Sequence, residues 1–296
     1  MSTRYPAADP AGGAALADGT RTGAVHLTVT DRERSAAFYR DAIGLRPHRD
    51  EERASALGAG GEDLVVLHEN RSAQPPGRHA GLYHFALLHP SREQLADAAL
   101  RVATTRTPIS GASDHGVSEA IYLPDPDGNG IELYADRRRD TWASEDGSRR
   151  IVMYTEPLDL DGLLSVAPAS EPASQADDGL TMGHVHLHVA DVAQALAFYR
   201  DVIGFELMAS IPQAAFLSAG GYHHHLGANT WRGEGVPPAP GGAVGLRHWT
   251  LLLDGPDEPA RMLERVNAAG ISHEERDGGL MLGDPSGNAV LAVPAA

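Results

Sequence analysis

Cysteine and lysine are both absent from this 296-residue chain, and each absence excludes a class of chemistry. Without cysteine the chain forms no disulfide, holds no thiolate-bound metal and has no thiol nucleophile. Without lysine it forms no Schiff base, because all 24 basic side chains are arginine. Aromatic residues make up only 5% of the chain, which disfavours a binding cleft lined mainly by aromatic rings.

Positive charge and long apolar runs are scarce as well. The formal net charge of −16 would repel nucleic-acid phosphates, so we expect no nucleic-acid partner. No apolar segment approaches the ~18 residues that a membrane span needs. Residues 1–22 are small and polar and lack the apolar core of a signal peptide. We therefore expect a disordered N-terminal extension there, on a cytoplasmic protein.

A long internal repeat runs through the chain. Residues 31–44 (DRERSAAFYRDAIG) return as residues 191–204 (DVAQALAFYRDVIG), and residues 125–129 (DPDGN) return as residues 284–288 (DPSGN). The two offsets, 160 and 159 residues, are nearly equal. The chain is therefore a duplication, and 42% hydrophobic residues are adequate for two packed cores.

Each half divides again into two similar units. In each unit a short alternating strand leads into a helix, and three more strands follow. Capping residues mark the helices: Asp31 and Gly44 at the two ends of one, and the pair Ser91 and Gln94 at the start of another. The expected fold class is α+β, with four βαβββ modules that form two half-barrel domains. The expected segments are an extension at 1–22, a first two-module domain at 23–136, a linker at 137–180 with one helical turn at 160–164, and a second two-module domain at 181–296.

Three strand segments carry polar side chains on one face and apolar side chains on the other. Three histidines alternate with valine and leucine in residues 183–189 (GHVHLHV), and His84 and Glu132 alternate with apolar neighbours in the same way. Two imidazoles and one carboxylate suit a divalent metal ion. We predict that one histidine of residues 183–189 meets His84 and Glu132.

These segments resemble the vicinal oxygen chelate superfamily, which contains glyoxalase I, bleomycin-resistance proteins and extradiol ring-cleaving dioxygenases. The resemblance covers about residues 23–136 and 181–293. It rests on the AFYRD-x-IG helices, the His-x-x-Leu strand openings and the segment DPDGNGIELY. The segments GLYHFALL, SDHGVSEAIYLPDPDGNGIELYADR and GHVHLHVADV with SAGGYHHHLGANTW are similar to two-domain catechol 2,3-dioxygenase-like proteins. The resemblance implies the glyoxalase/extradiol dioxygenase fold.

The resemblance also implies which positions bind the metal. The ligand histidine of the family stands three residues before a strand leucine, which selects His84, His184 and His248. The first module has Ala24 at this position, and His26 follows two residues later. The carboxylate position falls on Glu132 in the second module and on Leu291 in the fourth. The remaining histidines that we expect to be structural or surface residues are His26, His68, His79 and His273.

The order in which the modules pair decides whether a site exists. Pairing along the chain separates His184 from His84 and Glu132 and leaves both half-barrels with an incomplete triad. Crossed pairing, second module with third and first with fourth, gathers His84, Glu132 and His184 in one half-barrel and leaves the other blank. We predict crossed pairing, which the long linker permits.

A histidine run at residues 222–226 (YHHHL) offers an acid or base for catalysis. Alignment of Leu226 with the leucine after Glu132 places His225 at the carboxylate position, with His223 beside it. A match to the histidine pair of extradiol enzymes selects His224 instead. Both His224 and His225 stay candidates at this point.

Two further residues resemble the second set of proton donors in the family. Tyr122 stands ten residues before Glu132, a spacing found in extradiol enzymes, and His115 precedes it in the same segment. We therefore expect Tyr122 and His115 in catalytic roles. Asn229 and Trp231 are expected at the rim of the pocket.

The function that the resemblance implies is an extradiol dioxygenase that acts on a catechol-like aromatic diol with O2. The implied metal is Fe(II), with Mn(II) or another divalent ion as the alternative. A second hypothesis is a glyoxalase- or epimerase-type isomerase that uses Ni, Co or Zn, with His225 as a fourth ligand. A third is a non-catalytic resistance protein that binds a small molecule. The oligomeric state, with a homo-oligomer among the options, stays open.

Overall fold

A computed structural model describes residues 3–5, 15–51, 54–143 and 151–295 of the chain. These residues form four βαβββ modules, as the sequence predicts. The first module consists of β2 (Arg21–Val29), α1 (Arg32–Phe38) with a π-helical turn at Tyr39–Ile43, β3 (Arg46–Asp50), β4 (Ala54–Gly58) and β5 (Asp63–Glu69). The second consists of β6 (Gly81–His89), α2 (Arg92–Thr104), β7 (Gly111–Asp114), β8 (Ser118–Pro124) and β9 (Gly130–Asp136).

The second half of the chain repeats this order. The third module consists of β11 (Thr181–His188), α4 (Val192–Leu196) with a π-helical stretch at Ala197–Ile203, β12 (Glu206–Ile211), β13 (Ala214–Ser218) and β14 (Leu226–Asn229). The fourth consists of β15 (Gly245–Leu253), α5 (Glu258–Ala268), β16 (His273–Arg276), β17 (Gly279–Gly283) and β18 (Ala289–Pro294). Outside the modules lie β1 (Thr3–Tyr5), a 3-10 turn at Arg139–Thr141, β10 (Met153–Pro157) and α3 (Leu160–Leu164).

The predicted helix caps are present. Asp31 accepts a hydrogen bond from the backbone N–H of Arg34, and Ser91 accepts one from the N–H of Gln94. Gly44 ends its helix with φ of 87°, a left-handed conformation that glycine adopts without the steric cost of a Cβ atom. Local sequence therefore sets the bounds of these helices.

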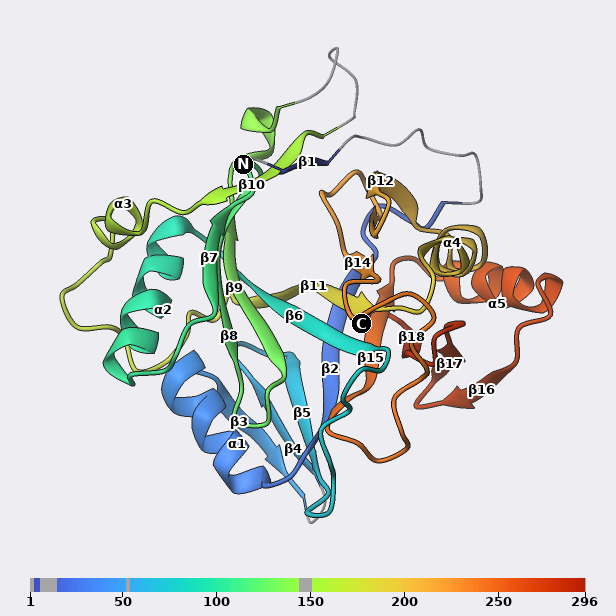
Figure 1. The fold of residues 1–296 in the computed structure, drawn as a ribbon, viewed down its shortest axis with the longest axis horizontal. Coiled ribbons are helices and arrows are strands. Elements are labelled where there is room, and N and C mark those ends of the chain that lie inside the picture. Colours follow the sequence, from blue (N-terminus) through green and yellow to red (C-terminus); the bar gives the residue numbers. More distant parts are fainter. Residues whose placement is uncertain (1–2, 6–14, 52–53, 144–150, 296) are drawn as a thin grey trace.

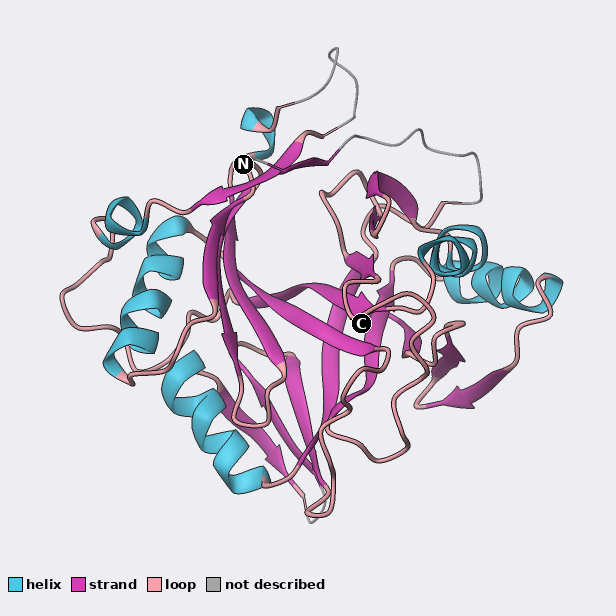
Figure 2. Ribbon diagram, viewed as in Figure 1, coloured by secondary structure: helices cyan, strands magenta, loops and turns pink. Residues whose placement is uncertain are grey.

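The modules pair in crossed order, which confirms the prediction. Strand β6 of the second module pairs antiparallel with β11 of the third, and β2 of the first pairs antiparallel with β15 of the fourth. One sheet has the order β1-β10-β7-β8-β9-β6-β11-β14-β13-β12, and the other has the order β16-β17-β18-β15-β2-β5-β4-β3. Figure 1 shows both sheets as curved half-barrels, and Figure 2 shows the helices on their outer sides. Whether residues 23–136 and 181–296 fold as independent domains stays a prediction.

One large hydrophobic core receives an equivalent leucine from the first strand of every module. Leu27, Leu87, Leu187 and Leu251 are all fully buried in this core. Because side chains alternate along a strand, the residue three positions before each leucine points to the opposite face, away from the core. The crossed pairing thus turns four equivalent positions toward the two half-barrel interiors.

Two segments differ from the expected disorder and linker. Leu16 is 3% exposed in the core, and its N–H donates to the Gly204 carbonyl at 2.9 Å. The disorder predicted for residues 1–22 is therefore wrong over residues 15–22, and also over residues 3–5, which form β1 and pair with β10. Residues 1–2 and 6–14 lie outside the described part. In the linker, the predicted helical turn at Leu160–Leu164 is confirmed, and β10 adds a strand that pairs with β7.

Candidate metal centre

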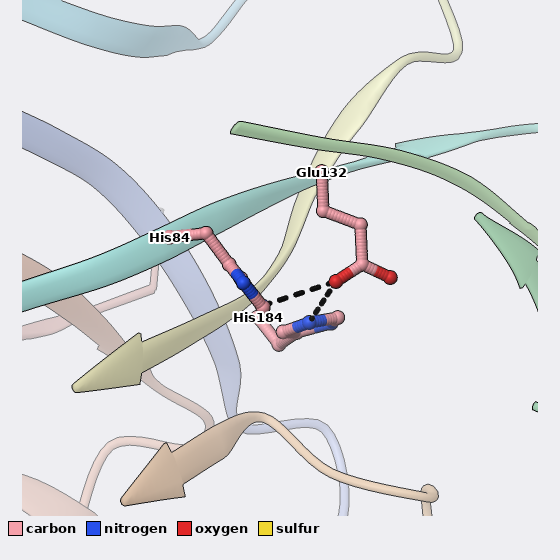
Figure 3. A group of neighbouring side chains, drawn as sticks. All are labelled: His84, Glu132 and His184. Carbon is pink, nitrogen blue, oxygen red and sulfur yellow. Dashed lines mark hydrogen bonds and ion pairs between the residues drawn. The ribbon is translucent and has the colours of Figure 1, made fainter. Parts of the chain in front are cut away.

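Three side chains from three neighbouring strands converge on one point inside the half-barrel that the second and third modules form (Figure 3). This is called the first half-barrel below, and the one formed by the first and fourth modules the second. Glu132 Oε2 lies 3.0 Å from His84 Nε2 and 3.2 Å from His184 Nε2. One ligand atom from each of the three residues lies within 4.8 Å of the other two. All three side chains are buried. The structure thus brings together the three residues predicted to bind metal.

The register of the sheet explains the convergence. Ala86 of β6 lies opposite Glu132 of β9 on one side and opposite His184 of β11 on the other. Directly opposed residues share a face of the sheet, and so do residues two apart on one strand, which adds His84. Ala86 has only a methyl group, so the three longer side chains meet above it.

The environment of the triad favours the ionisation states that bind a metal ion. Burial by itself would raise the pKa of Glu132, but His184 and His84 beside it hold this pKa well below its usual value. Burial lowers the pKa of His184 to about 4, although Glu132 opposes the shift. A carboxylate and a neutral imidazole are the forms that coordinate a divalent ion.

An unsatisfied nitrogen atom also fits a metal ion at this place. His84 Nε2 is buried and lacks a hydrogen-bond partner within the described part of the chain. The Nε2 atom of His84 lies 3.0 Å from Glu132 Oε2, a contact that is an ion pair only when His84 is protonated. A buried polar atom without a partner costs about 1–3 kcal/mol, which coordination would offset. Two histidines and one carboxylate form a donor set used by non-haem Fe(II) oxygenases.

Two members of the triad, His84 and Glu132, line a cavity of about 680 Å³. Residues of the second and third modules line this cavity. Its walls include the predicted residues Tyr122, His115 and His224. Tyr83 and Trp231, 39% and 42% exposed, stand edge to face at 5.3 Å. Trp231 lines the cavity as expected. The volume is in the range of sites for small organic molecules.

Comparison with known proteins agrees with this geometry. Residues 21–133 and 181–291 match the model of the Glyoxalase/Bleomycin resistance protein/Dioxygenase superfamily. The chain belongs to this superfamily. It is 43% identical over 277 residues to a protein of Bacillus subtilis (strain 168) named Catechol-2,3-dioxygenase, covering 92% of this chain and 96% of the relative.

Two solved structures have a similar fold. Glyoxalase I from Zea mays aligns with a TM-score of 0.59 at 18% identity, covering 93% of this chain and 92% of the maize chain. A putative dioxygenase from Bacillus subtilis subsp. subtilis str. 168 aligns with a TM-score of 0.63 at 12% identity, covering 93% and 87%. None of the described helices has the length and apolar character of a membrane span.

Tyr122 and His115 lie together at the cavity wall. In the antiparallel pair of β8 and β9, Tyr122 stands directly opposite Glu132. The Tyr122 hydroxyl lies 2.7 Å from His115 Nε2, and His115 Nδ1 lies 3.0 Å from the Tyr154 carbonyl oxygen. Because a carbonyl only accepts, Nδ1 of His115 carries the proton and a neutral His115 accepts from Tyr122 at Nε2.

The histidine run takes a different position from the one that strand phase predicts. The alignment of Leu226 assumed that residues 222–226 lie in a strand, but β14 begins only at Leu226. Leu226 pairs with Val185 in the way that Ile131 pairs with Phe85, so Leu226 corresponds to Ile131 and not to the leucine after Glu132. The carboxylate position of this module is therefore occupied by Gly227. The phase argument for His225 therefore fails by two residues.

His224 and His225 point to different parts of the molecule. His224 lines the triad cavity, and its ring lies 4.1 Å from that of His184. His225 is not among the residues that line this cavity. Its Nδ1 lies 3.1 Å from Ser218 Oγ and accepts from the Ala219 N–H at 3.2 Å. The structure thus places His224, and not His225, beside the metal ligands.

Asp136 is a residue that the sequence reasoning missed. His223 Nε2 lies 3.0 Å from Asp136 Oδ1, and His223 Nδ1 lies 2.8 Å from His224 Nδ1. A carboxylate only accepts, so Nε2 of His223 donates to Asp136 and its Nδ1 accepts from His224. This chain of hydrogen bonds does not use the lone pair on Nε2 of His224. The alternation in IELYAD, which puts Asp136 on the face of Glu132, was a signal that could have found it.

In the second half-barrel, Ala24, His248 and Leu291 stand at the positions equivalent to the triad. His248 lies opposite His26 across the β2–β15 pair, and the two rings stack at 4.0 Å. His26 Nδ1 also lies 3.1 Å from His68 Nε2. Leu291, 5% exposed, fills the carboxylate position. Among the described residues, the triad of the first half-barrel is the one group with metal-ligand spacing.

Proposed function

We propose that this protein is a metal-dependent extradiol dioxygenase that cleaves a catechol-like aromatic diol with O2, with Fe(II) as its metal and Mn(II) as the alternative. The observation that carries the proposal is the convergence of His84, Glu132 and His184, with His84 and Glu132 in the wall of one cavity. The 43% identity to a protein named Catechol-2,3-dioxygenase supports an oxidoreductase of this kind.

The triad residues would hold the ion from one side, with the cavity on the other. When bound, the ion supplies a centre that brings a catechol and O2 together and passes electrons between them. The buried carboxylate of Glu132 offsets part of the positive charge. The cavity walls then have to orient the diol and exchange its protons.

His224 is the proposed base. The hydrogen bonds from His224 to His223 and from His223 to Asp136 hold the proton of His224 on Nδ1. Its Nε2 lone pair is then available to take a proton from a catechol hydroxyl. Asp136 stabilises positive charge on this pair of imidazoles as the proton arrives, which makes it a positioning residue.

Tyr122 and His115 form a second proton path. The Tyr122 hydroxyl donates to His115 Nε2, so its oxygen lone pairs remain free to accept from the substrate. A proton received by Tyr122 can pass on to His115, which the Tyr154 carbonyl holds in place. The same pair can return a proton during ring opening.

The isomerase alternative requires a fourth protein ligand, for which His225 was the candidate. The hydrogen bonds of His225 to Ser218 and Ala219 hold it away from the triad cavity. No fourth His, Asp or Glu joins the triad within the described part of the chain. The donor set therefore favours the dioxygenase over the isomerase. The resistance-protein alternative predicts tight drug binding that survives His84→Ala.

The test is reconstitution with Fe(II) under anaerobic conditions, followed by catechol and O2. We expect a yellow ring-fission product and about one metal ion per chain. His84→Ala should abolish both, and His248→Ala, the change at the equivalent position of the other half-barrel, should preserve both. A fully metal-loaded protein that turns over no member of a catechol panel would refute the proposal. Reconstitution with Mn(II) in parallel identifies the preferred metal.

A further inference from the structure

A second cavity, of about 630 Å³, lies against the sheet of the first and fourth modules. Residues of β15, β16 and β17 line it together with loops at residues 75–77 and 239–244. It belongs to the half-barrel that has no metal triad. The proposed dioxygenase chemistry uses the cavity beside the triad and leaves this second cavity without a role.

The second cavity is lined by positive groups in a protein of net charge −16. Arg232, Arg247 and Arg276 all contribute to its wall. Among its described lining residues Asp127 is the one carboxylate, and Asp127 already accepts from Thr30 and Arg34 at 2.6 Å each. A cavity that concentrates arginine without matching carboxylates favours an anion.

The polar groups of this wall are available for a ligand. His248 is 5% exposed, and its Nε2 is buried with no hydrogen-bond partner in the described part of the chain. Arg247 forms no ion pair with any described residue, and Arg276 reaches Asp277 only at 3.5 Å. A buried imidazole nitrogen with no partner, beside two weakly engaged guanidinium groups, is a site that lacks its ligand's oxygen atoms.

The histidines here do not form a metal site. His248 stacks on His26 and His26 on His68, each pair at an interplanar angle of 24°. The lone pairs of an imidazole lie in the plane of its ring, so the stacked rings of His248 and His26 direct theirs side by side rather than at one point. The facing nitrogens of His26 and His68 already engage each other at 3.1 Å. In the other half-barrel the rings of His84 and His184 are inclined at 66° and meet at Glu132. The carboxylate position here is the apolar Leu291.

The electrostatic potential around the histidines is positive. The pKa of His248 is lowered to about 4, mainly by burial and then by Arg276, His68 and Arg247, against a smaller opposing effect of Asp277. The pKa of His26 falls to about 3 by burial, with His248 and His68 and then the same two arginines contributing. His248 is therefore neutral at physiological pH and offers an N–H rather than a charge.

We propose that this second cavity binds a small organic carboxylate. Arg247 and Arg276 pair with the carboxylate, and His248 donates to it from Nε2. Leu82, Leu246 and Met281 line the same cavity and provide apolar contact for the carbon skeleton of the ligand. The proposal is independent of the dioxygenase function, because it uses no residue of the triad.

The test is calorimetric titration of the metal-loaded protein with benzoate and with succinate, at ionic strength matched with chloride. We expect saturable binding that the double variant Arg247→Gln/Arg276→Gln weakens about tenfold or more. Arg138→Gln, an exposed arginine elsewhere, is the matched control and should bind as the wild type does. Arg247 and Arg276 are exposed, so these variants should fold normally.

Binding at the triad is distinguished by repeating the titration with Glu132→Gln. An affinity that survives Glu132→Gln but falls in the arginine variant supports the second cavity. An affinity unchanged by the arginine substitutions, or no heat with either carboxylate up to about 10 mM, overturns the proposal. Tighter binding of inorganic phosphate than of both carboxylates would overturn it as well.

Discussion

Tyr122 lies directly opposite Glu132 across the hairpin of β8 and β9, so the proposed proton-transfer hydroxyl and the proposed metal-ligand carboxylate face the same cavity. The turn between them sets this register. Asp125 accepts from the N–H groups of Asp127 and Asn129, at 2.9 and 2.8 Å, and Pro124 pairs with Gly130. The ten-residue spacing is thus the length of a hairpin that carries two functional groups on one face.

Tyr122→Phe should lower kcat/KM by about a hundredfold and leave the metal content unchanged, because it removes a proton-transfer group without removing a ligand. The measurement is ring-cleavage rate together with metal analysis of the same sample. Tyr154→Phe is the control, since His115 uses only the backbone carbonyl of Tyr154. Wild-type rates for Tyr122→Phe would show that the hydroxyl has no part in catalysis.

His224→Gln should lower kcat by about a hundredfold or more, since it removes the base. Asp136→Asn should have a smaller effect, because His224 keeps its place but loses the carboxylate that holds its tautomer through His223. The matched control is His225→Gln, which changes the neighbouring histidine outside the cavity. If His225→Gln lowers the rate as much as His224→Gln does, the assignment of the base is wrong.

Gly183→Ala should destabilise the protein and weaken metal binding. A Cβ atom at this position would lie 1.8 Å from the Tyr134 hydroxyl oxygen, so β11 or Tyr134 must move next to His184. Overpacking of this kind costs about 1–3 kcal/mol. Urea unfolding and metal titration measure the two effects. Gly61→Ala, with nothing within 4 Å of the added atom, should match the wild type, and equal stability of both variants would contradict the argument.

His89 predicts a specific loss of stability in acid. Burial, with a smaller effect of Arg101, lowers its pKa to about 3, so the folded protein stays neutral there while the unfolded chain binds a proton below pH ~6.5. Its contribution to stability is therefore present above pH ~6.5 and falls as the pH drops toward about 3.

His89→Leu removes this dependence. Between pH 8 and pH 5 the free energy of unfolding of the wild type should fall by about 2 kcal/mol more than that of the variant. Denaturant unfolding at the two pH values gives the comparison. His273→Leu, a change at an exposed histidine, should leave the wild-type dependence in place. Parallel decline in wild type and His89→Leu would rule out His89 as a source of acid lability.

Much of the site could be predicted because the relevant signals are local. Alternation in a strand assigns His84, Glu132 and His184 to polar faces, and the capping residues Asp31 and Ser91 mark where helices begin. The repeat shows that the modules are equivalent. From equivalence alone, crossed pairing is the one order that completes a triad, and the sheets confirm it.

The histidine run shows where local signals end. Alternation assigns a face only inside a strand, and His223, His224 and His225 precede β14. Their directions depend on contacts with Asp136 and Ser218, which the chain brings near only after folding. Gly227, and not His225, lies opposite His186. Nothing in the sequence pattern indicates this difference of two residues from the strand-phase alignment.

By itself, the sequence determined the four modules, their helix bounds and the three metal-ligand candidates, because each depends on residues close together in the chain. Tertiary structure alone decided the direction of His224, the link to Asp136, and the stacked histidines and arginines of the second cavity. Those features depend on strand register and on side-chain contacts between modules. The physical reason is that a face of a strand is a local property, whereas the partner across that face is not.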